Sequence, residues 1–278
     1  YKEGQQVLEY IAARHGEEKI LLLMENFWKS NLFSEVLKVT IGKDYKEFDE
    51  DWLYYLKKRY YPLFADLDAP SGVTKNIVKE GFNNKPIYYA HDGKREVYFI
   101  GNYTGYTNIY RLNLDADKPK PEVVVEGEKT DEFEAFHLFQ SKLDISKDGL
   151  LAFVTKSGEN DALHLYDVRK NELVETIRFR SLVVLGSPSW SPDGKRIAFS
   201  SIDKSGNNDL YVLELETRSL VRLTNDFYDD RDPAWSPTGD RIAFSSDRNP
   251  YGNEGKYNLF LYDFRKASIE YLTVGKEN

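Results

Sequence analysis

The sequence predicts a mainly β-stranded fold preceded by a small α-helical segment. Residues 1–61 place apolar side chains at helical spacing, and no comparable pattern recurs later in the chain. From about residue 63, short runs such as "RIAFSS" and "DLYVLEL" alternate in the manner of strands, with Gly, Pro, Asn and Asp between them. In addition, "SPSWSPDGKRIAFSS" at 187–201 is repeated as "DPAWSPTGDRIAFSS" at 232–246. A fold built from repeated strand units is therefore expected after the helices.

The helical segment covers residues 1–62 and is expected to contain four amphipathic helices. Asp44 and Glu47 have the spacing of a capping box at the start of the last helix, and Pro62 is expected to end it. Ser34 is the expected N-cap of the third helix and Gly42 its terminating residue. The expected helices lie within 3–16, 17–29, 33–42 and 44–62.

Residues 63–87 are expected to form a linker followed by a first strand, "GVTKNIV" at 72–78. Strand-type runs then fill residues 88–278, and a turn glycine recurs at positions 93, 149, 194 and 239, giving intervals of 56, 45 and 45 residues. The longer interval indicates an insertion near 129–141. Repeats of this length with several short strands predict a β-propeller with one four-stranded blade per repeat.

The repeated motif has a structural explanation in such a blade. Trp190 and Trp235 are large, rigid side chains suited to the gap between adjacent blades. Pro188 and Pro233 cannot donate a hydrogen bond to a strand ladder, which places them on the edge strand that faces the central channel. The Gly of "SPDG" and "SPTG" allows the turn that follows. Repetition therefore marks the scaffold, and a binding site is expected in the parts that do not repeat.

The motif "SPSWSPDGKRIAFSS…NNDLYVLELETRSLVRLT" resembles the repeat of TolB-like β-propellers, which also occurs in propeller domains of some serine and tricorn-type peptidases. In the two earlier units, His91 and Lys147 replace the motif's Pro, and Tyr89 and Ile145 replace its Trp. The resemblance implies six blades, whereas four are recognisable. The chain is thus expected to be either a fragment of a longer protein, as part of a six-bladed ring, or a compact four-bladed variant.

Residues 1–62 resemble the C-terminal helical end of gluzincin-type zinc peptidase domains. That activity would require His-Glu-x-x-His on one helix, with Glu as the general base. The four histidines, at 15, 91, 137 and 164, are not in that motif, and Glu3 has no partners for a zinc site, so we interpret it as a helix-start carboxylate. No catalytic residue, metal site or cofactor is therefore predicted in this chain.

Composition excludes several other classes of function. The formal net charge of −8 argues against a nucleic-acid surface, which requires clustered basic residues. The absence of Cys excludes disulfides and thiolate metal sites, and no apolar run is long enough to span a bilayer. Neither a Gly-x-Ser-x-Gly motif nor a phosphate-binding loop is present.

Candidate binding residues lie at the channel mouth and in the loops. The stretch "NDFYDDRDP" at 225–233 carries four Asp, which fits either a site for a cation or basic partner or a solvated loop between blades. Exposed Tyr in loops is a good contact residue for proteins. The candidates are Ser187, Asp229, Asp230, Arg231, Asp232, Tyr103, Tyr106 and Tyr251.

These observations favour a non-catalytic module that binds a protein or peptide through its propeller. The alternative is a fragment of a zinc metallopeptidase whose catalytic motif lies upstream and whose propeller filters or positions the substrate. The TolB-like resemblance implies export to the bacterial periplasm or the cell surface.

Overall fold

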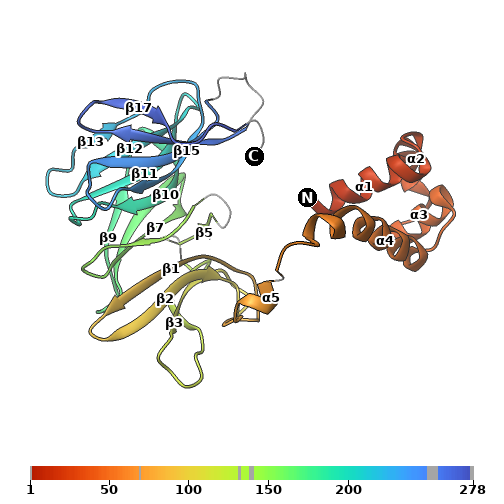
Figure 1. Cartoon of the computed structure of the whole chain (residues 1–278), viewed down its shortest axis with the longest axis horizontal. Coiled ribbons are helices and arrows are strands. Elements are labelled where there is room, and N and C mark those ends of the chain that lie inside the picture. The colour runs from red at the N-terminus through yellow and green to blue at the C-terminus, as the bar shows by residue number, and fades with distance from the viewer. Residues whose placement is uncertain (1, 69, 131–132, 138–140, 249–255, 276–278) are drawn as a thin grey trace. The chain divides into compact units, whose positions relative to one another are not determined.

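The computed structural model describes residues 2–68, 70–130, 133–137, 141–248 and 256–275 (Figure 1). The chain forms two compact units, residues 1–76 and 77–278. None of the helices in the described ranges has the length and apolar character needed to cross a membrane.

The first unit is a helical bundle with its own apolar core. Its buried side chains come from the first four α-helices: Tyr10, Ile11, Leu23, Val36, Leu37 and Phe48. The elements are α1 (Lys2–His15), α2 (Glu18–Asn26), the 3-10 helix η1 (Phe27–Lys29), α3 (Phe33–Ile41), α4 (Tyr45–Phe64) and α5 (Pro70–Val73).

The capping box predicted for α4 is confirmed. The Glu47 amide donates to Asp44 Oδ1 at 2.9 Å, and the Asp44 amide donates to Glu47 Oε2 at 3.1 Å. Gly42 ends α3 with a φ of 84°, as expected. Two other helix boundaries were predicted wrongly. Leu32, and not Ser34, precedes α3, and α4 continues past Pro62 because a missing amide so near the helix end removes only one hydrogen bond.

The second unit is a β-propeller of four antiparallel sheets, which confirms the mainly β fold expected from the sequence (Figure 1). We number the sheets blades 1 to 4 in chain order. Blade 1 contains β1 (Asn83–His91), β2 (Lys94–Gly101), β3 (Asn108–Asn113) and β4 (Glu122–Glu126); blade 2 contains β5 (Ala135–Phe136), β6 (Asp144–Ile145), β7 (Leu150–Ser157), β8 (Asn160–Asp167) and β9 (Glu172–Arg178). Blade 3 contains β10 (Leu182–Trp190), β11 (Arg196–Asp203), β12 (Asn208–Glu214) and β13 (Leu220–Arg222); blade 4 contains β14 (Asp230–Trp235), β15 (Arg241–Ser246), β16 (Asn258–Asp263) and β17 (Ser268–Tyr271).

The insertion expected near 129–141 lies in the first strand of blade 2. This strand is divided into β5 and β6, which both pair with β7. The strand expected at 72–78 is a wrong prediction, because this segment begins in α5 and the first strand starts only at Asn83. Its apolar residues Ile77 and Val78 instead contact the sheet of blade 1 and line a hollow there with Phe99.

The two repeated prolines lie where the sequence predicted them. Pro188 is on β10 and Pro233 is on β14, and each of these strands is the first edge of its sheet. A β-bulge interrupts the strand pairing at both positions. The bulge residues Ser187 and Asp232 take φ values of 49° and 52°, in the left-handed region that L-residues rarely adopt.

The two repeated tryptophans pack between blades, as expected. Trp190 is 6% exposed and lies among apolar residues of blades 2 and 3, and its amide donates to Asp144 Oδ2 of blade 2 at 2.6 Å. Trp235 lies among residues of blades 3 and 4. Its ring stacks on Phe264 with 5.2 Å between centroids, and the guanidinium of Arg196 in blade 3 lies 4.5 Å from its ring.

Strand register corrects the assignment of the Trp-equivalent residue in blade 1. Tyr88 pairs with Val97 as Trp190 pairs with Ile197, so Tyr88 occupies the tryptophan position. Tyr89 faces the opposite way, toward blade 2, where its hydroxyl donates to the Lys147 carbonyl at 3.4 Å. The error arose because the β1–β2 hairpin is longer than its counterparts, which shifts an alignment made on the turn glycine.

Replacing Trp190 with Ala should lower the free energy of unfolding by about 3–5 kcal/mol, because it leaves a large cavity between two blades. Urea unfolding followed by circular dichroism measures this loss. Trp28→Ala is the control: that side chain is 81% exposed, so its loss should change stability by at most about 0.5 kcal/mol. Equal effects of the two substitutions would contradict the role of Trp190 as an inter-blade wedge.

Candidate functional site

The two bulge residues meet at the inner edge of the propeller. The Ser187 hydroxyl on β10 donates to Asp232 Oδ1 on β14. The Ser187 amide donates to Ser141 Oγ, which precedes β6, at 3.0 Å. Lys142 extends from the same segment and donates to the Pro233 carbonyl at 2.8 Å. These contacts join the inner edges of blades 2, 3 and 4, and they involve the non-repeating positions singled out from the sequence.

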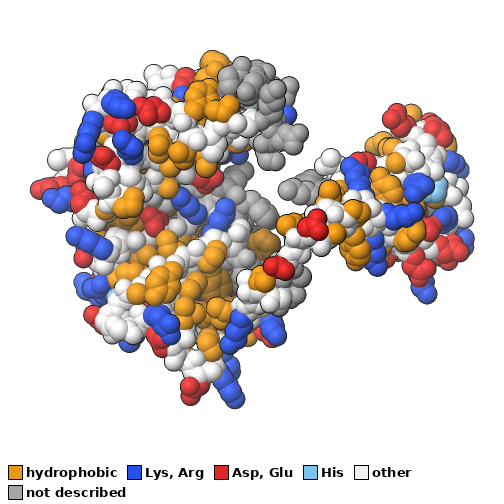
Figure 2. Space-filling model, in the orientation of Figure 1, with side chains coloured by type: hydrophobic (Ala, Val, Ile, Leu, Met, Phe, Trp, Pro, Cys, Tyr) orange, Lys and Arg blue, Asp and Glu red, His pale blue; other side chains and the backbone are white. Residues whose placement is uncertain are grey.

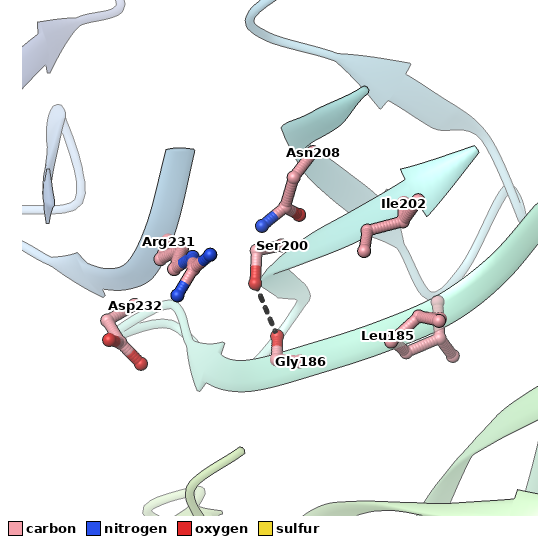
Figure 3. A pocket seen from close by; sticks show the side chains of 8 residues that line it. Leu185, Gly186, Ser200, Ile202, Asn208, Arg231 and Asp232 are labelled. Atoms are coloured by element: carbon pink, nitrogen blue, oxygen red, sulfur yellow. Dashed lines mark hydrogen bonds between the residues drawn. The ribbon is translucent and has the colours of Figure 1, made fainter. Parts of the chain in front are cut away.

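Next to this point a pocket of about 140 Å³ opens between blades 3 and 4 (Figure 3). Arg231 of β14 extends toward Ser200 and Asn208, which come from β11 and β12. The Ser200 hydroxyl donates to the Gly186 carbonyl at 3.3 Å, which fixes its position in the wall. The pocket thus combines an aliphatic wall with uncharged polar groups and with charged groups of both signs. Its lining is Val184, Leu185, Gly186, Ser200, Ile202, Asn208, Arg231 and Asp232.

Asp229 holds the polar side of this pocket in place. Arg231 Nε donates to Asp229 Oδ1 at 2.7 Å, and Asn208 Nδ2 donates to the same oxygen at 2.6 Å. The Tyr257 hydroxyl donates to Asp229 Oδ2 at 2.6 Å, and the Arg231 guanidinium lies 5.1 Å from the Tyr257 ring. Asp229 therefore positions Arg231, whose side chain is still 50% exposed and open to a ligand.

The pKa of Asp229 reflects these contacts. Burial by itself raises the pKa of this carboxyl, but hydrogen bonds from Arg231, Tyr257 and Asn208 favour the charged form more strongly and hold the pKa below its ordinary value. Asp229 is consequently ionised at neutral pH. Its charge is balanced by Arg231, and the exposed Asp232 supplies the carboxylate that lines the pocket.

Asp230 points away from the pocket and is fully buried. Arg248 Nη2 donates to Asp230 Oδ2 at 2.6 Å, and burial raises the pKa of this carboxyl. The carboxylate oxygens of Asp209, Asp226 and Asp230 lie within 4.8 Å of one another. Arg222 binds Asp209 and Arg248 binds the other two, so the group is an ion-pair network that already contains its cations.

The two candidate tyrosines that the structure describes lie outside this pocket. Tyr103 and Tyr106 are 42% and 53% exposed and lie in the β2–β3 loop of blade 1, outside the pocket lining. The Tyr103 ring meets Tyr110 edge-on at 6.3 Å, and Lys129 Nζ lies 5.8 Å from the Tyr106 ring. Tyr251 lies outside the described residues.

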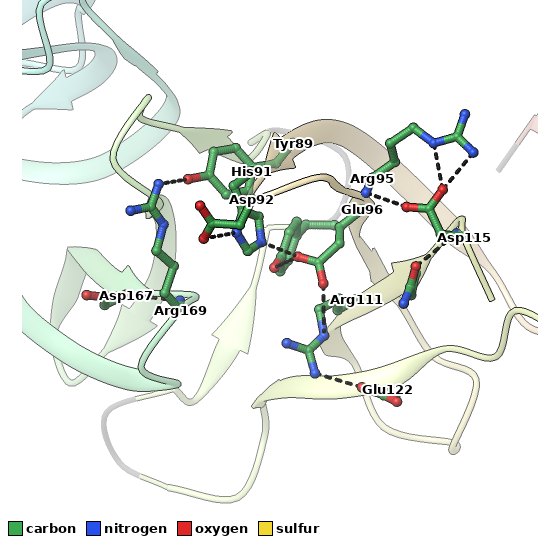
Figure 4. Close-up of polar contacts among 12 residues, drawn as sticks. Tyr89, His91, Asp92, Arg95, Glu96, Arg111, Asp115, Glu122, Asp167 and Arg169 are labelled. Atoms are coloured by element: carbon green, nitrogen blue, oxygen red, sulfur yellow. Dashed lines mark hydrogen bonds and ion pairs between the residues drawn. The ribbon is translucent and has the colours of Figure 1, made fainter.

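A second polar network lies within blade 1 (Figure 4). Glu96 is buried, accepts a hydrogen bond from the Tyr98 hydroxyl at 2.6 Å and lies 3.1 Å from His91 Nε2. Burial and this hydrogen bond raise the pKa of Tyr98. Arg111 donates to Glu122 at 2.7 Å and lies 3.9 Å from Glu96. Since these groups bind one another across β1 to β4, the network is structural.

Sequence reasoning missed three residues of the candidate site. Ser200 was interpreted as repeated scaffold, and neither Asn208 nor Tyr257 was selected as a candidate. The sequence contains only part of the information needed to find Ser200 and Asn208. Alternation on β11 places Ser200 on the face opposite Phe199, but it does not show that Ser200 lies beside Arg231. Tyr257 precedes β16 and reaches Asp229 from 28 residues away, a contact that alternation does not predict.

Comparison with known proteins agrees with the fold. Residues 144–278 match the family model of the TolB beta propeller domain. The chain is 26% identical over 119 residues to the Tol-Pal system protein TolB of Ruthia magnifica subsp. Calyptogena magnifica, covering 42% of this chain and 26% of that protein. It is 37% identical over 75 residues to the TolB protein of Nitrosomonas europaea, covering 27% of this chain and 17% of that protein. The chain thus spans only about a quarter or less of these curated relatives.

Solved structures show the same architecture. A TolB-type protein from Agrobacterium tumefaciens superposes with a TM-score of 0.50 at 24% identity, covering 70% of this chain and 63% of that chain. A puromycin hydrolase mutant superposes with a TM-score of 0.52 at 14% identity, covering 74% of this chain and 31% of that chain. At these identities the similarity shows a shared fold and not a shared activity.

Asp229→Asn should reduce the dependence of stability on acid pH. The folded-state pKa of Asp229 is lowered, so its stabilising contribution is complete above the ordinary Asp value of about 3.9 and is lost as the pH falls through the folded-state value. We expect the variant to be about 1–3 kcal/mol less stable at pH 7, because it loses charge-assisted hydrogen bonds, and to lose less stability in acid. Urea unfolding at several pH values measures both effects.

Asp117→Asn is the matched control, because Asp117 is exposed between β3 and β4. The free energy of unfolding of this variant should equal that of the wild-type protein at every pH. If Asp229→Asn also followed the wild-type protein, Asp229 would not be the residue that holds the polar side of the pocket.

Proposed function

We propose that this chain, whose residues 144–278 match the family model of the TolB beta propeller domain, is a non-catalytic module that binds a protein or peptide segment at the pocket between blades 3 and 4. The observation that supports this most directly is the exposed Arg231 and Asp232 pair beside an aliphatic wall. A peptide presents both hydrogen-bond donors and acceptors along its backbone, and a pocket with groups of both charges can bind both. The side chains of Val184 and Ile202 offer the apolar surface that anchors such a segment.

The size of the pocket favours a macromolecular partner over a small molecule. Pockets for drug-sized ligands and cofactors usually measure about 300–1,000 Å³. The 140 Å³ found here accommodates about one side chain of a larger partner. Interfaces between proteins commonly bury one or a few anchor side chains in pockets of this kind. We therefore expect one residue of the partner to enter the pocket while its neighbours contact the rim.

The chemistry of the pocket supports binding without catalysis. Its lining contains no His, Cys or Lys among the residues that the structure describes. The nearby Ser187 hydroxyl is bonded directly to the Asp232 carboxylate, with no imidazole between them to accept a proton. The described polar groups can therefore hold a partner, and we assign them no chemical step.

The metallopeptidase alternative stays a prediction, as does the resemblance of residues 1–62 to a gluzincin-type domain. The four histidines make separate contacts: His15 packs on the Tyr10 ring at 5.8 Å, His91 lies beside Glu96, His137 lies 2.8 Å from Asp161, and His164 lies 2.7 Å from Thr155. No contact among the described residues specifically favours this alternative.

We also propose that the protein works in the periplasm or at the cell surface. The similarity to Tol-Pal system proteins supports this location. A partner at that location would be another exported protein or an exposed segment of one.

Arg231→Ala should weaken peptide binding by at least about tenfold, because Arg is a frequent anchor of protein interfaces. Peptides would be selected from a phage-displayed library against the wild-type protein, and the affinity of one selected peptide would then be measured by calorimetry. Arg265→Ala is the control, since that side chain is 80% exposed in the β16–β17 turn.

Unchanged affinity after Arg231→Ala would contradict the proposed site. Mass spectrometry of the selected peptide after incubation provides a separate test of the non-catalytic role. We expect the peptide to remain intact, and cleavage that a chelator abolishes would support the metallopeptidase alternative instead.

A further inference from the structure

The helical unit contains a pocket of its own, with a volume of about 270 Å³, between the end of α1 and the middle of α4. Three tyrosines, two cations, a histidine and a carboxylate form its wall. This lining is locally basic in a chain whose formal net charge is −8. Figure 2 shows Lys and Arg side chains beside hydrophobic ones on the visible face of this unit. The lining residues are Tyr10, Arg14, His15, Lys43, Asp51, Tyr54 and Tyr55.

Tyr10 brings a hydroxyl without a hydrogen-bond partner into this pocket. The residue is 4% exposed, and its ring packs on Phe48 and Tyr55 with 5.4 Å and 5.1 Å between centroids. The hydroxyl makes no hydrogen bond to any residue that the structure describes, and it is not enclosed by protein atoms either, so it is open to the pocket. Burial and the nearby Asp51 carboxylate raise the pKa of Tyr10. The hydroxyl therefore keeps its proton at neutral pH and can donate to a ligand.

Arg14 supplies a guanidinium without an acidic partner. The residue is exposed at the end of α1, and its Cζ lies 5.7 Å from the centroid of the Tyr55 ring. Within the described ranges of the chain it makes no hydrogen bond and no ion pair. A planar guanidinium binds a carboxylate or a phosphate through two parallel hydrogen bonds. Arg14 is therefore free to bind an anionic group at the edge of the pocket.

The carboxylate in the lining is already paired with a cation. Asp51 accepts a hydrogen bond from the Lys43 ammonium, so it does not neutralise Arg14. Burial lowers the pKa of His15, and the positive charges of Lys43 and Lys19 lower it further. The imidazole is therefore neutral at pH 7, and an anion that entered the pocket would meet a positive potential.

We propose that this pocket binds a small anion that carries an aromatic ring, either an aryl carboxylate or an aryl phosphate. Arg14 would pair with the anionic group, and the Tyr10 hydroxyl would donate to one of its oxygens. The rings of Tyr54 and Tyr55 offer aromatic surface to the ring of the ligand. The volume of 270 Å³ lies just below the range of about 300–1,000 Å³ for drug-sized ligands, which suits a single ring with one charged group.

This inference goes beyond the proposed function. The pocket lies within residues 1–76, whereas the proposed peptide site lies in the propeller. Failure of one would not affect the other.

Calorimetric titration of the full chain with benzoate and with phenyl phosphate tests the proposal. At least one of them should bind with a Kd of about 1 mM or lower, and the tighter one identifies the anionic group that the pocket prefers. For benzoate, benzamide lacks the charge and acetate lacks the ring. For phenyl phosphate, benzyl alcohol and inorganic phosphate are the corresponding ligands. Each of these should bind at least about tenfold more weakly than its parent, because it loses either the ion pair or the ring contacts.

Two variants locate the site. Arg14→Gln should weaken binding of the tighter ligand by at least about tenfold, because it removes the charge and the paired donors. Tyr10→Phe keeps the ring and should weaken binding by about threefold to tenfold, through the loss of one hydrogen bond. Lys29→Gln is the control: Lys29 is exposed in η1 and outside the lining, so removing its charge should leave the affinity unchanged.

Absence of binding by both aromatic anions would overturn the proposal. Equal affinity for a parent ligand and its uncharged or ringless counterpart would also overturn it, as would binding that Arg14→Gln leaves unchanged. Circular dichroism would establish that each variant is folded. If Arg14→Gln fails to fold, Arg14→Lys replaces it, since lysine keeps the charge and lacks the planar fork. The ligand comparison on the wild-type protein does not depend on the folding of any variant.

Discussion

A four-stranded propeller blade cannot bury either face of its sheet alone, and the rest of this structure depends on that constraint. Each blade must pack one face on the preceding blade and the other on the following blade. Trp190 and Trp235 fill the two junctions where they occur, and the backbone amide of Trp190 ties its strand to Asp144 of the preceding blade. Packing between blades, more than pairing within them, therefore specifies the order and spacing of the sheets.

The same constraint decides where a binding site can form. Both faces of a blade are committed to packing, so side chains that are free to meet a partner lie at strand ends and at bulges. Ser187 and Asp232 lie at bulges of the inner strands, in a backbone conformation that the surrounding ladder enforces. The pocket beside Arg231 is built from these positions and from the ends of β11 and β12. Its composition can therefore vary without disturbing the packing between blades.

Residues close together in the sequence have very different roles at this junction. Asp230 and Asp232 lie in one acidic stretch and cannot be distinguished by composition. In the structure Asp230 is buried beside Arg248, whereas Asp232 is exposed and lines the pocket. Strict alternation along β14 would put Asp230 and Asp232 on the same face of the sheet, and the bulge at Asp232 breaks that alternation. Tyr88 and Tyr89 show the same effect, because a hairpin longer than its counterparts exchanged their expected positions.

The sequence by itself determined the mainly β architecture, the two tryptophan wedges and the edge prolines. These features repeat, and each follows from local chemistry: turn glycines, proline without an amide, and the alternation of strands. It also pointed to the acidic stretch of the candidate site. Only the tertiary structure decided that Asn208 and Tyr257 position Asp229. Those relationships join residues from different strands and blades, and the distances between them depend on register and bulges that no local pattern specifies.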